Sequence, residues 1–272
     1  MHGIGNDFIV LDNRKGQIPE KELGKTAMKL CKRYFSIGAD GILVVSSSSV
    51  ADAKMRIFNA DGSEAETSGN GVRCFAKYCY ENSVIDKKKE LKIEALAGVK
   101  NVWLKTEKGK VASITVDMGE PILERSRIPV VGNGKCVNED LRVEGANYKI
   151  TCVSVGNPHC VIFVDNTQNF PVSTVGPKIE NHKMFPARIN AEFAQVLNRN
   201  EIKLRVWERG VGETLACGTG ACATVVAANV LGKVDNLCVV HLLGGDLKIE
   251  LRDNRILMTG TADKAFEGTV DL

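Results

Sequence analysis

Hydrophobic and polar positions along the chain alternate in short runs, as in β-strands with one buried face. In the first half, such runs predict strands at residues 6–12, 41–46, 54–59, 90–96, 100–106 and 111–117. In the second half, they predict strands at residues 149–155, 159–165, 192–197, 202–208, 237–242, 246–251 and 255–259.

Three segments instead predict helices, and the first two carry apolar positions spaced as on one face of an amphipathic helix. The first opens at Pro19 and carries apolar positions at Leu23, Ala27, Leu30, Cys31 and Tyr34. The second begins near Asn70 and turns inward the side chains of Val72, Phe75, Ala76 and Cys79. The third, "TGACATVVAANVL" from about Thr219 to Leu231, is apolar nearly all round, which predicts a buried helix at the centre of a wrapped sheet. The pattern predicts an α+β fold.

The chain also repeats itself, which bears directly on its architecture. A shift of 149 positions lays "KMRIFNADGSEAETSGNG" (54–71) on "KLRVWERGVGETLACGTG" (203–220) without a gap. With a shift of 151, "GIGNDFIVLD" (3–12) resembles "SVGNPHCVIFVD" (154–165). We expect two pseudo-symmetric domains, each a mixed or antiparallel sheet around a central helix. The first comprises residues 1–117, joined by a C-terminal strand at 263–272, and the second comprises residues 118–262.

Both halves run strand, polar loop, Gly-x-Gly, helix, with Ser68 before one Gly-x-Gly and Cys217 before the other. The first N–H groups of a helix lack intrahelical partners and favour an anion. The same position favours a thiolate, which predicts a lowered pKa for Cys217. A carboxylate held between the two loops would have its α-carbon flanked on opposite faces by residues 68 and 217. Inversion of a stereocentre needs two acid/base groups placed in that way.

Composition and charge are those of an ordinary globular protein. The 272 residues include 36 Lys and Arg against 33 Asp and Glu, a net charge of +3. The longest basic run, Lys87 to Lys89, is expected to be a solvated turn, so no nucleic-acid surface is predicted. No apolar stretch reaches the about 18 residues that a membrane span needs, and "MHGIGNDFIV" lacks a signal-peptide layout. We therefore expect a cytoplasmic protein.

Neither a metal nor a nucleotide site is expected. The nine cysteines are odd in number and form no C-x-x-C, which is typical of reduced, buried thiols. None of the histidines stands at zinc-type spacing from a cysteine pair: His2, His159, His182 and His241. A P-loop motif is absent. "GTGACA" fits G-x-G-x-x-A, but the surrounding strands do not form the βαβ pattern of a dinucleotide site.

Taken together, eight motifs resemble those of the diaminopimelate epimerase family over nearly the whole chain. They are "MHGIGNDF" (1–8), "GADG" (38–41), "FNADGSEAE" (58–66), "GNGVRCFAKY" (69–78), "VGNPHCV" (155–161), "FPARINAEF" (185–193), "RVWERGVGETLACGTGACA" (205–223) and "LMTG" (257–260). The resemblance implies a cofactor-independent isomerase of bacterial lysine biosynthesis that interconverts LL- and meso-2,6-diaminopimelate. It also implies an active site in the cleft between two pseudo-symmetric domains, no pyridoxal phosphate, and a homodimer.

The resemblance assigns roles to individual residues. Cys217 matches one catalytic cysteine, and Ser68 falls where the family has the other. His159 and Glu208 match a polar pair beside the reacting centre. The remaining matches are to residues that bind the substrate: Asn6, Asn59, Gly69, Asn70, Asn157, Asn190, Glu208, Arg209, Gly218 and Thr219. The guanidinium of Arg209 suits the distal carboxylate of the substrate.

Structural interpretations stay open for several of these residues. Asn6 and Asn157 follow glycines and fit turns, Arg209 fits a surface charge, and His159 fits a hydrogen-bonded core histidine.

Ser68 departs from the family pattern, because a hydroxyl is a far weaker acid than a thiol. Three explanations remain. The chain is an epimerase impaired by loss of one cysteine, or it is another amino-acid racemase or a one-base dehydratase of the same fold, or it binds amino acids without catalysis.

Overall fold

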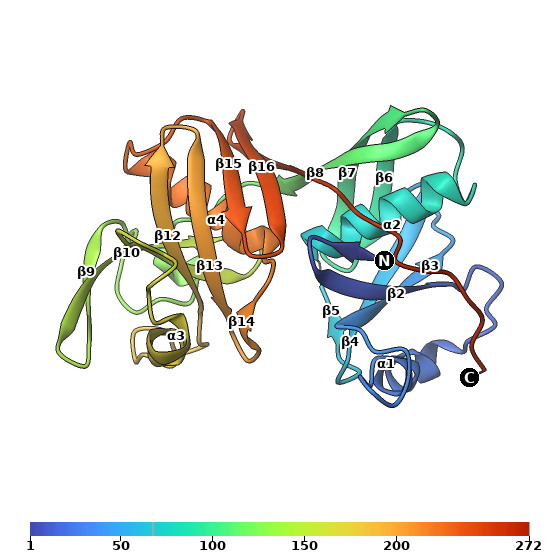
Figure 1. The fold of residues 1–272 in the computed structure, drawn as a ribbon, viewed down its shortest axis with the longest axis horizontal. Helices are drawn as coiled ribbons and strands as arrows, with labels where there is room; N and C mark the ends of the chain where they lie inside the picture. The colour runs from blue at the N-terminus through green and yellow to red at the C-terminus, as the bar shows by residue number, and fades with distance from the viewer. Residues whose placement is uncertain (67, 272) are drawn as a thin grey trace. The chain divides into compact units, whose positions relative to one another are not determined.

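The computed structural model describes residues 1–66 and 68–271, which divide into two compact units (Figure 1). One unit combines Met1–Asp117 with Thr259–Leu272, and the other is Met118–Met258. The chain crosses from the first unit to the second within strand β8 (Lys110–Gly119), and it returns within β17 (Arg255–Gly260).

The first unit contains two α-helices and a short 3-10 helix. These are η1 (Glu20–Glu22), α1 (Leu23–Leu30) and α2 (Gly69–Glu81). Besides β8, its strands are β1 (His2–Gly3), β2 (Asn6–Asp12), β3 (Gly41–Ser46), β4 (Ala53–Asn59), β5 (Glu64–Ala65), β6 (Glu90–Ala95) and β7 (Gly98–Glu107).

From its first α-helix onward, the second unit repeats the order of the first: an α-helix, three strands, a second α-helix and further strands. Its helices are η2 (Arg125–Arg127), α3 (Val172–Glu180) and α4 (Gly218–Val230). Besides β17, its strands are β9 (Glu139–Val143), β10 (Ala146–Ser154), β11 (Pro158–Phe163), β12 (Asn190–Asn198), β13 (Glu201–Glu208), β14 (Gly212–Thr214), β15 (Leu237–Leu242) and β16 (Gly245–Arg252).

Strand pairing is equivalent in the two units. In the first, β2 pairs parallel with β3, β3 antiparallel with β4, β4 parallel with β6, and β6 antiparallel with β7. In the second, β11, β12, β13, β15 and β16 pair in the same sequence of directions. The short β5 and β14 lie antiparallel to β4 and β13. The repeat in the sequence is therefore a repeat of topology, and the predicted α+β class is confirmed.

Each unit wraps its sheet around one helix. Helix α2 contacts β1, β2, β3, β4 and β6, and α4 contacts β10, β11, β12, β15 and β16. Every residue of α4 from Gly218 to Ala228 is buried, as its apolar sequence predicts.

A second helix covers the other face of each sheet. In β3, Ile42 and Val44 pack with Leu23 and Ala27 of α1, whereas Leu43 lies beneath Gly71 of α2. Burial on both faces explains why "GILVV" is continuously apolar. In β12, Phe193 packs into the core that includes Val172 and Ile179 of α3.

Two details of the predicted elements are wrong. Helix α1 ends at Leu30, and Tyr34 is 99% exposed with φ +71°. The chain turns back after Leu30, and the N–H of Gly38 donates a hydrogen bond to the carbonyl of Leu30 at 2.9 Å.

The predicted strand at 263–272 is also absent from its described part, 263–271, where only an isolated bridge joins Asp263 to His2. This segment, "DKAFEGTVD", is exposed throughout and has no buried face to order it as a strand. Leu272 lies outside the described residues.

Several elements were not predicted from the sequence, and α3 is the most important of them. It contains Gly176 and Pro177, which weaken a helical pattern. None of the helices in the described ranges has the length and apolar character for crossing a bilayer.

Gly176 is where α3 meets β13 most closely. A Cβ built there would lie 2.5 Å from Cγ of Trp207. Replacing a helical glycine by alanine ordinarily stabilises a helix by about 1 kcal/mol. At this position the ring must move, so the steric cost exceeds that gain.

We therefore expect Gly176→Ala to lower the free energy of unfolding by about 1–3 kcal/mol in denaturant titrations. Gly268→Ala is the control, because no other described residue lies within 4 Å of its added Cβ. Equal stability of both variants would contradict the packing described for α3.

Candidate active site

Ser68 caps the start of α2. Its backbone is extended (φ −147°, ψ 119°), and its Oγ accepts a hydrogen bond from the N–H of Gly71 at 3.1 Å. This N-cap bond fixes the hydroxyl beside the first turn, where helical N–H groups lack intrahelical acceptors. Gly69 and Asn70 form that turn and are buried. The first unit therefore has a capped helix start at the place where the sequence predicts that an anion binds.

Asn6 and Asn70 are brought together in this unit. The Nδ2 of Asn70 donates to Oδ1 of Asn6 at 3.1 Å, and the Nδ2 of Asn6 donates to Asp40 at 2.7 Å. Arg33 in turn binds Asp7 and Asp40 at 2.7 and 2.9 Å.

Sequence reasoning assigned no role to Asp7, Arg33 or Asp40, although Asp7 and Asp40 lie in two of the motifs that carry the resemblance. Asn59 has a different partner, since its Nδ2 donates to Oγ of Ser63 at 3.0 Å.

Cys217 occupies the equivalent cap of α4 in the second unit. Its backbone is extended (φ −122°, ψ 104°), and its Sγ accepts from the N–H of Gly220 at 3.4 Å. The Oγ1 of Thr219 lies 3.6 Å from the same sulfur. Ser68 and Cys217 are therefore twin residues, each at the start of the central helix of its own unit.

The prediction that Cys217 has a lowered pKa is wrong for this structure. The residue is only 5% exposed, and burial, followed by the negative charges of Glu208 and Glu192, raises the pKa of the thiol well above its usual value. The hydrogen bonds from Thr219 and Gly220 act in the opposite direction and are outweighed.

A buried polar chain lies beside this cap. Nδ1 of His159 is 2.5 Å from Oε1 of Glu192, and Nε2 of His159 is 2.9 Å from Oδ1 of Asn157. His159 and Glu192 are both 0% exposed. A Cβ on Gly220 would lie 2.9 Å from either oxygen of Glu192, so this carboxyl group lies directly under the first turn of α4.

Glu192 was not singled out from the sequence. The available signal was a carboxylate in the otherwise apolar "NAEFA" of β12. His159 is buried, and both of its ring nitrogens lie within hydrogen-bonding distance of another side chain.

Glu208, Asn190 and Arg209 gather where β13 ends. Oε1 of Glu208 accepts from the hydroxyl of Thr214 at 2.5 Å. Asn190 accepts from the backbone N–H of Arg209 at 2.8 Å and donates to the carbonyl of Pro158 at 2.7 Å. The guanidinium of Arg209 donates to the carbonyl of Ala187 at 2.8 Å.

Glu180 of α3 holds the turn that carries Arg209. It is buried, and it accepts from the N–H of Gly210 at 2.9 Å, from the indole of Trp207 at 2.8 Å and from Arg188 at 3.0 Å. Sequence reasoning missed Glu180 because it missed the helix that bears it.

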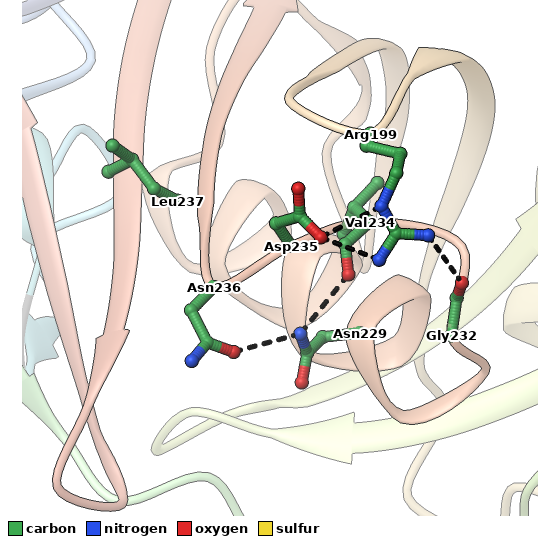
Figure 2. Close-up of a pocket in the computed structure, with 7 residues that line it drawn as sticks. All are labelled: Arg199, Asn229, Gly232, Val234, Asp235, Asn236 and Leu237. Carbon is green, nitrogen blue, oxygen red and sulfur yellow. Dashed lines mark hydrogen bonds and ion pairs between the residues drawn. The ribbon is translucent and has the colours of Figure 1, made fainter.

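A surface depression lies away from these residues. Figure 2 shows this open pocket, of about 570 Å³, at the end of α4, with Arg199 held by Asp235 at 2.5 Å. None of the predicted site residues lines it. Within the described ranges, no three His, Cys, Asp or Glu side chains are grouped as a metal site.

Comparisons with known proteins agree with the resemblance. The family model for "Diaminopimelate epimerase" matches residues 1–124 and 151–265. A diaminopimelate epimerase of Moorella thermoacetica is 50% identical over all of this chain and 98% of its own length. That of Pelotomaculum thermopropionicum is 51% identical over 98% of this chain and 96% of its own length.

Solved structures share the fold at low identity. A Bacillus anthracis phenazine biosynthesis protein of the PhzF family has a TM-score of 0.68 at 18% identity, covering 96% of this chain and 92% of that one. An Agrobacterium vitis hydroxyproline epimerase has a TM-score of 0.66 at 15% identity, covering 89% and 78%. The full-length identity of about 50% and the matching family model show that the chain belongs to the diaminopimelate epimerase family.

Proposed function

We propose that this chain interconverts LL- and meso-2,6-diaminopimelate by moving a proton at one α-carbon. One observation carries the proposal: Ser68 and Cys217 are the N-caps of equivalent helices in two units of equivalent topology. A two-sided proton transfer needs a pair of this kind, with one group on each face of the carbon.

The helix starts supply the binding site for the reacting carboxylate. Its oxygens would accept from N–H groups at Gly69, Asn70, Gly218 and Thr219, and the helix dipoles favour the negative charge. Such donors also stabilise the extra charge that develops on the carboxylate as the α-proton leaves.

Further residues recognise the rest of the substrate. Arg209 suits the distal carboxylate, because a guanidinium can donate two parallel hydrogen bonds. We assign Asn6, Asn59, Asn157 and Asn190 to the amino and carboxylate groups, and His159 and Glu208 to the reacting centre. The hydrogen bond between Asn190 and the backbone of Arg209 supports placing these two in one subsite.

Ser68 limits the chemistry in this proposal. Its hydroxyl keeps the cap bond to Gly71, so the loop retains its shape and substrate binding is spared. As an acid or base, however, a hydroxyl is far poorer than a thiol. We infer a competent binding site with impaired inversion, in which Cys217 is the effective acid/base group.

The proposal needs no resident cofactor, since both proton-transfer groups are side chains. The family resemblance further supports a cytoplasmic homodimer that acts in lysine biosynthesis.

One-base chemistry, as in a dehydratase of this fold, is the alternative that Ser68 favours. Another amino-acid racemase of the same fold is a second alternative. A non-catalytic amino-acid binder is a third alternative.

Replacing Ser68 by cysteine should restore two-sided proton transfer. We expect Ser68→Cys to accelerate the inversion of diaminopimelate at least about 100-fold, the lower end of what a well-placed acid/base group contributes. Incubation with the LL isomer in deuterium oxide, followed by NMR and chiral chromatography, measures both label entry and inversion.

The double variant Ser68→Cys/Cys217→Ala is the matched control and should again be slow. A Ser68→Cys protein that is inactive on diaminopimelate but active on another amino acid would refute the proposed substrate. Loss of water from 3-hydroxyproline would favour one-base chemistry, and tight binding without label exchange would favour a binder.

The charge environment of Cys217 predicts its reactivity. Because its pKa is raised, the thiolate fraction is small at neutral pH, and alkylation by iodoacetamide should speed up about tenfold per pH unit up to pH 9. Glu208→Gln removes one nearby negative charge while retaining an acceptor for Thr214. This change lowers the pKa of the thiol, and we expect alkylation to become about three- to tenfold faster at pH 8.

Peptide mass spectrometry assigns the modified residue. Cys238 is the internal control: burial and then Glu201 raise its pKa to about 11, so Glu208→Gln should leave its rate unchanged. Rapid, pH-independent alkylation of Cys217 would show that the thiolate already predominates in the ligand-free protein.

A further inference from the structure

The hydrogen-bonding chain Asn157–His159–Glu192 fixes where one proton must lie. The amide oxygen of Asn157 can only accept, so Nε2 of His159 must carry a hydrogen and donate it across 2.9 Å. The 2.5 Å contact between Nδ1 and Oε1 of Glu192 then holds a second proton. That proton lies either on the ring, beside a carboxylate, or on the carboxyl group, beside a neutral ring.

Both arrangements make His159 and Glu192 a pair with no net charge. Burial, opposed by His159, raises the pKa of Glu192, which favours the neutral acid. Its second oxygen, Oε2, is buried and accepts no hydrogen bond from any residue in the described ranges. An ionised carboxylate would pay a large desolvation cost for a bare oxygen, and a neutral acid pays much less.

The first unit provides an internal comparison. In the parallel pair β11–β12, His159 lies opposite Asn190 and Val161 opposite Glu192. In the equivalent pair β2–β3, Phe8 lies opposite Gly41 and Val10 opposite Leu43. Phe8 and Leu43 are thus the twins of His159 and Glu192.

The two helix starts confirm this equivalence. A Cβ on Gly71 would meet Leu43, and a Cβ on Gly220 would meet Glu192. At equivalent positions beside the helix start, the first unit therefore has an apolar pair, Phe8 and Leu43, and the second has a polar pair, His159 and Glu192. Since buried polar pairs add little stability over apolar ones, the fold gives no reason for Glu192.

What the pair controls is the amide of Asn157. This residue is partly exposed, and its Nδ2 has no hydrogen-bond partner within residues 1–66 and 68–271. With Oδ1 held by the ring, Nδ2 is left to donate to a ligand. A ring with its proton on Nδ1 instead would favour the rotated amide, which presents an acceptor to a carboxylate.

We propose that Glu192 is a positioning residue: by sharing a proton with His159, it keeps the Nε2–H of that ring on Asn157 and so presents the NH₂ of Asn157 to the substrate. This inference rests on the proposed function for the identity of the ligand.

Two substitutions separate this role from a structural one. Glu192→Gln can donate an amide N–H to Nδ1, so the ring keeps its Nε2–H. Glu192→Leu copies Leu43 of the first unit and leaves Nδ1 without a partner. The double variant His159→Phe/Glu192→Leu copies both Phe8 and Leu43, and we expect it to fold with a melting temperature close to that of the parent.

Titration calorimetry with meso-diaminopimelate gives the binding readout. We expect Glu192→Gln to bind within about threefold of the parent, and both leucine variants about 10- to 100-fold more weakly, the range for a lost hydrogen bond to a charged group. Thr224→Val is the control. It removes a buried hydroxyl group of α4 that has no hydrogen-bond partner within the described ranges. The affinity for meso-diaminopimelate should therefore stay unchanged.

Nitrogen-15 NMR of the histidine rings in the ligand-free protein gives a readout that needs no substrate. The parent and Glu192→Gln should carry the His159 hydrogen on Nε2, and Glu192→Leu should lose that preference. A parent ring with a bare Nε2, or parent-like affinity in both leucine variants, would overturn the role of Glu192. If the parent fails to bind diaminopimelate while the ring pattern holds, the proposed substrate fails and the proton assignment stands.

Discussion

The hydrogen bond between an N-cap side chain and the third residue of a central helix is the interaction on which the site depends. It occurs twice, from Gly71 to Ser68 and from Gly220 to Cys217. In each case it fixes a reactive atom beside a set of N–H groups that have no partner in the helix. An added Cβ would lie 3.2 Å from Leu43 at Gly71 and 2.9 Å from Glu192 at Gly220, so side chains of the sheet pack closely against both helix starts. The geometry of the loop is therefore set by backbone and packing, and it tolerates oxygen or sulfur at the cap.

Opposing effects meet at Cys217, and their relative size decides its charge. The helix start and its hydrogen bonds favour a thiolate, whereas burial and two carboxyl groups favour the thiol. In this structure the second set is larger. A buried thiol is a suitable proton donor, and it becomes a base once a ligand or a proton acceptor changes its surroundings.

Much of the fold could be predicted because its signals are local. Strands such as β3 and β13 carry unbroken apolar or alternating patterns, and α4 is apolar on every side. Helix α3 could not be predicted, since Gly176 and Pro177 weaken its pattern and its stability comes from contact with Trp207. The predicted strand over the exposed residues 263–271 is absent for a different reason: its apolar residues have no neighbouring surface to pack against.

Some residues of the candidate site could likewise be predicted from the sequence, and others could not. Ser68, Cys217 and the asparagines could be singled out because the repeat and the motifs point to them. Glu180 and Glu192 could not, because their importance lies in partners that are distant in sequence, such as Gly210 and His159. The prediction of a lowered pKa for Cys217 was wrong because the sequence does not show how deeply its sulfur is buried.

All nine cysteines of the chain are buried as free thiols. Peroxide attacks the thiolate form, and it requires access to the sulfur. Cys217 is buried and protonated, and position 68 carries oxygen instead of sulfur. We therefore expect the ligand-free protein to react slowly with oxidants. Oxygen rather than sulfur at position 68 also removes one possible site of oxidation.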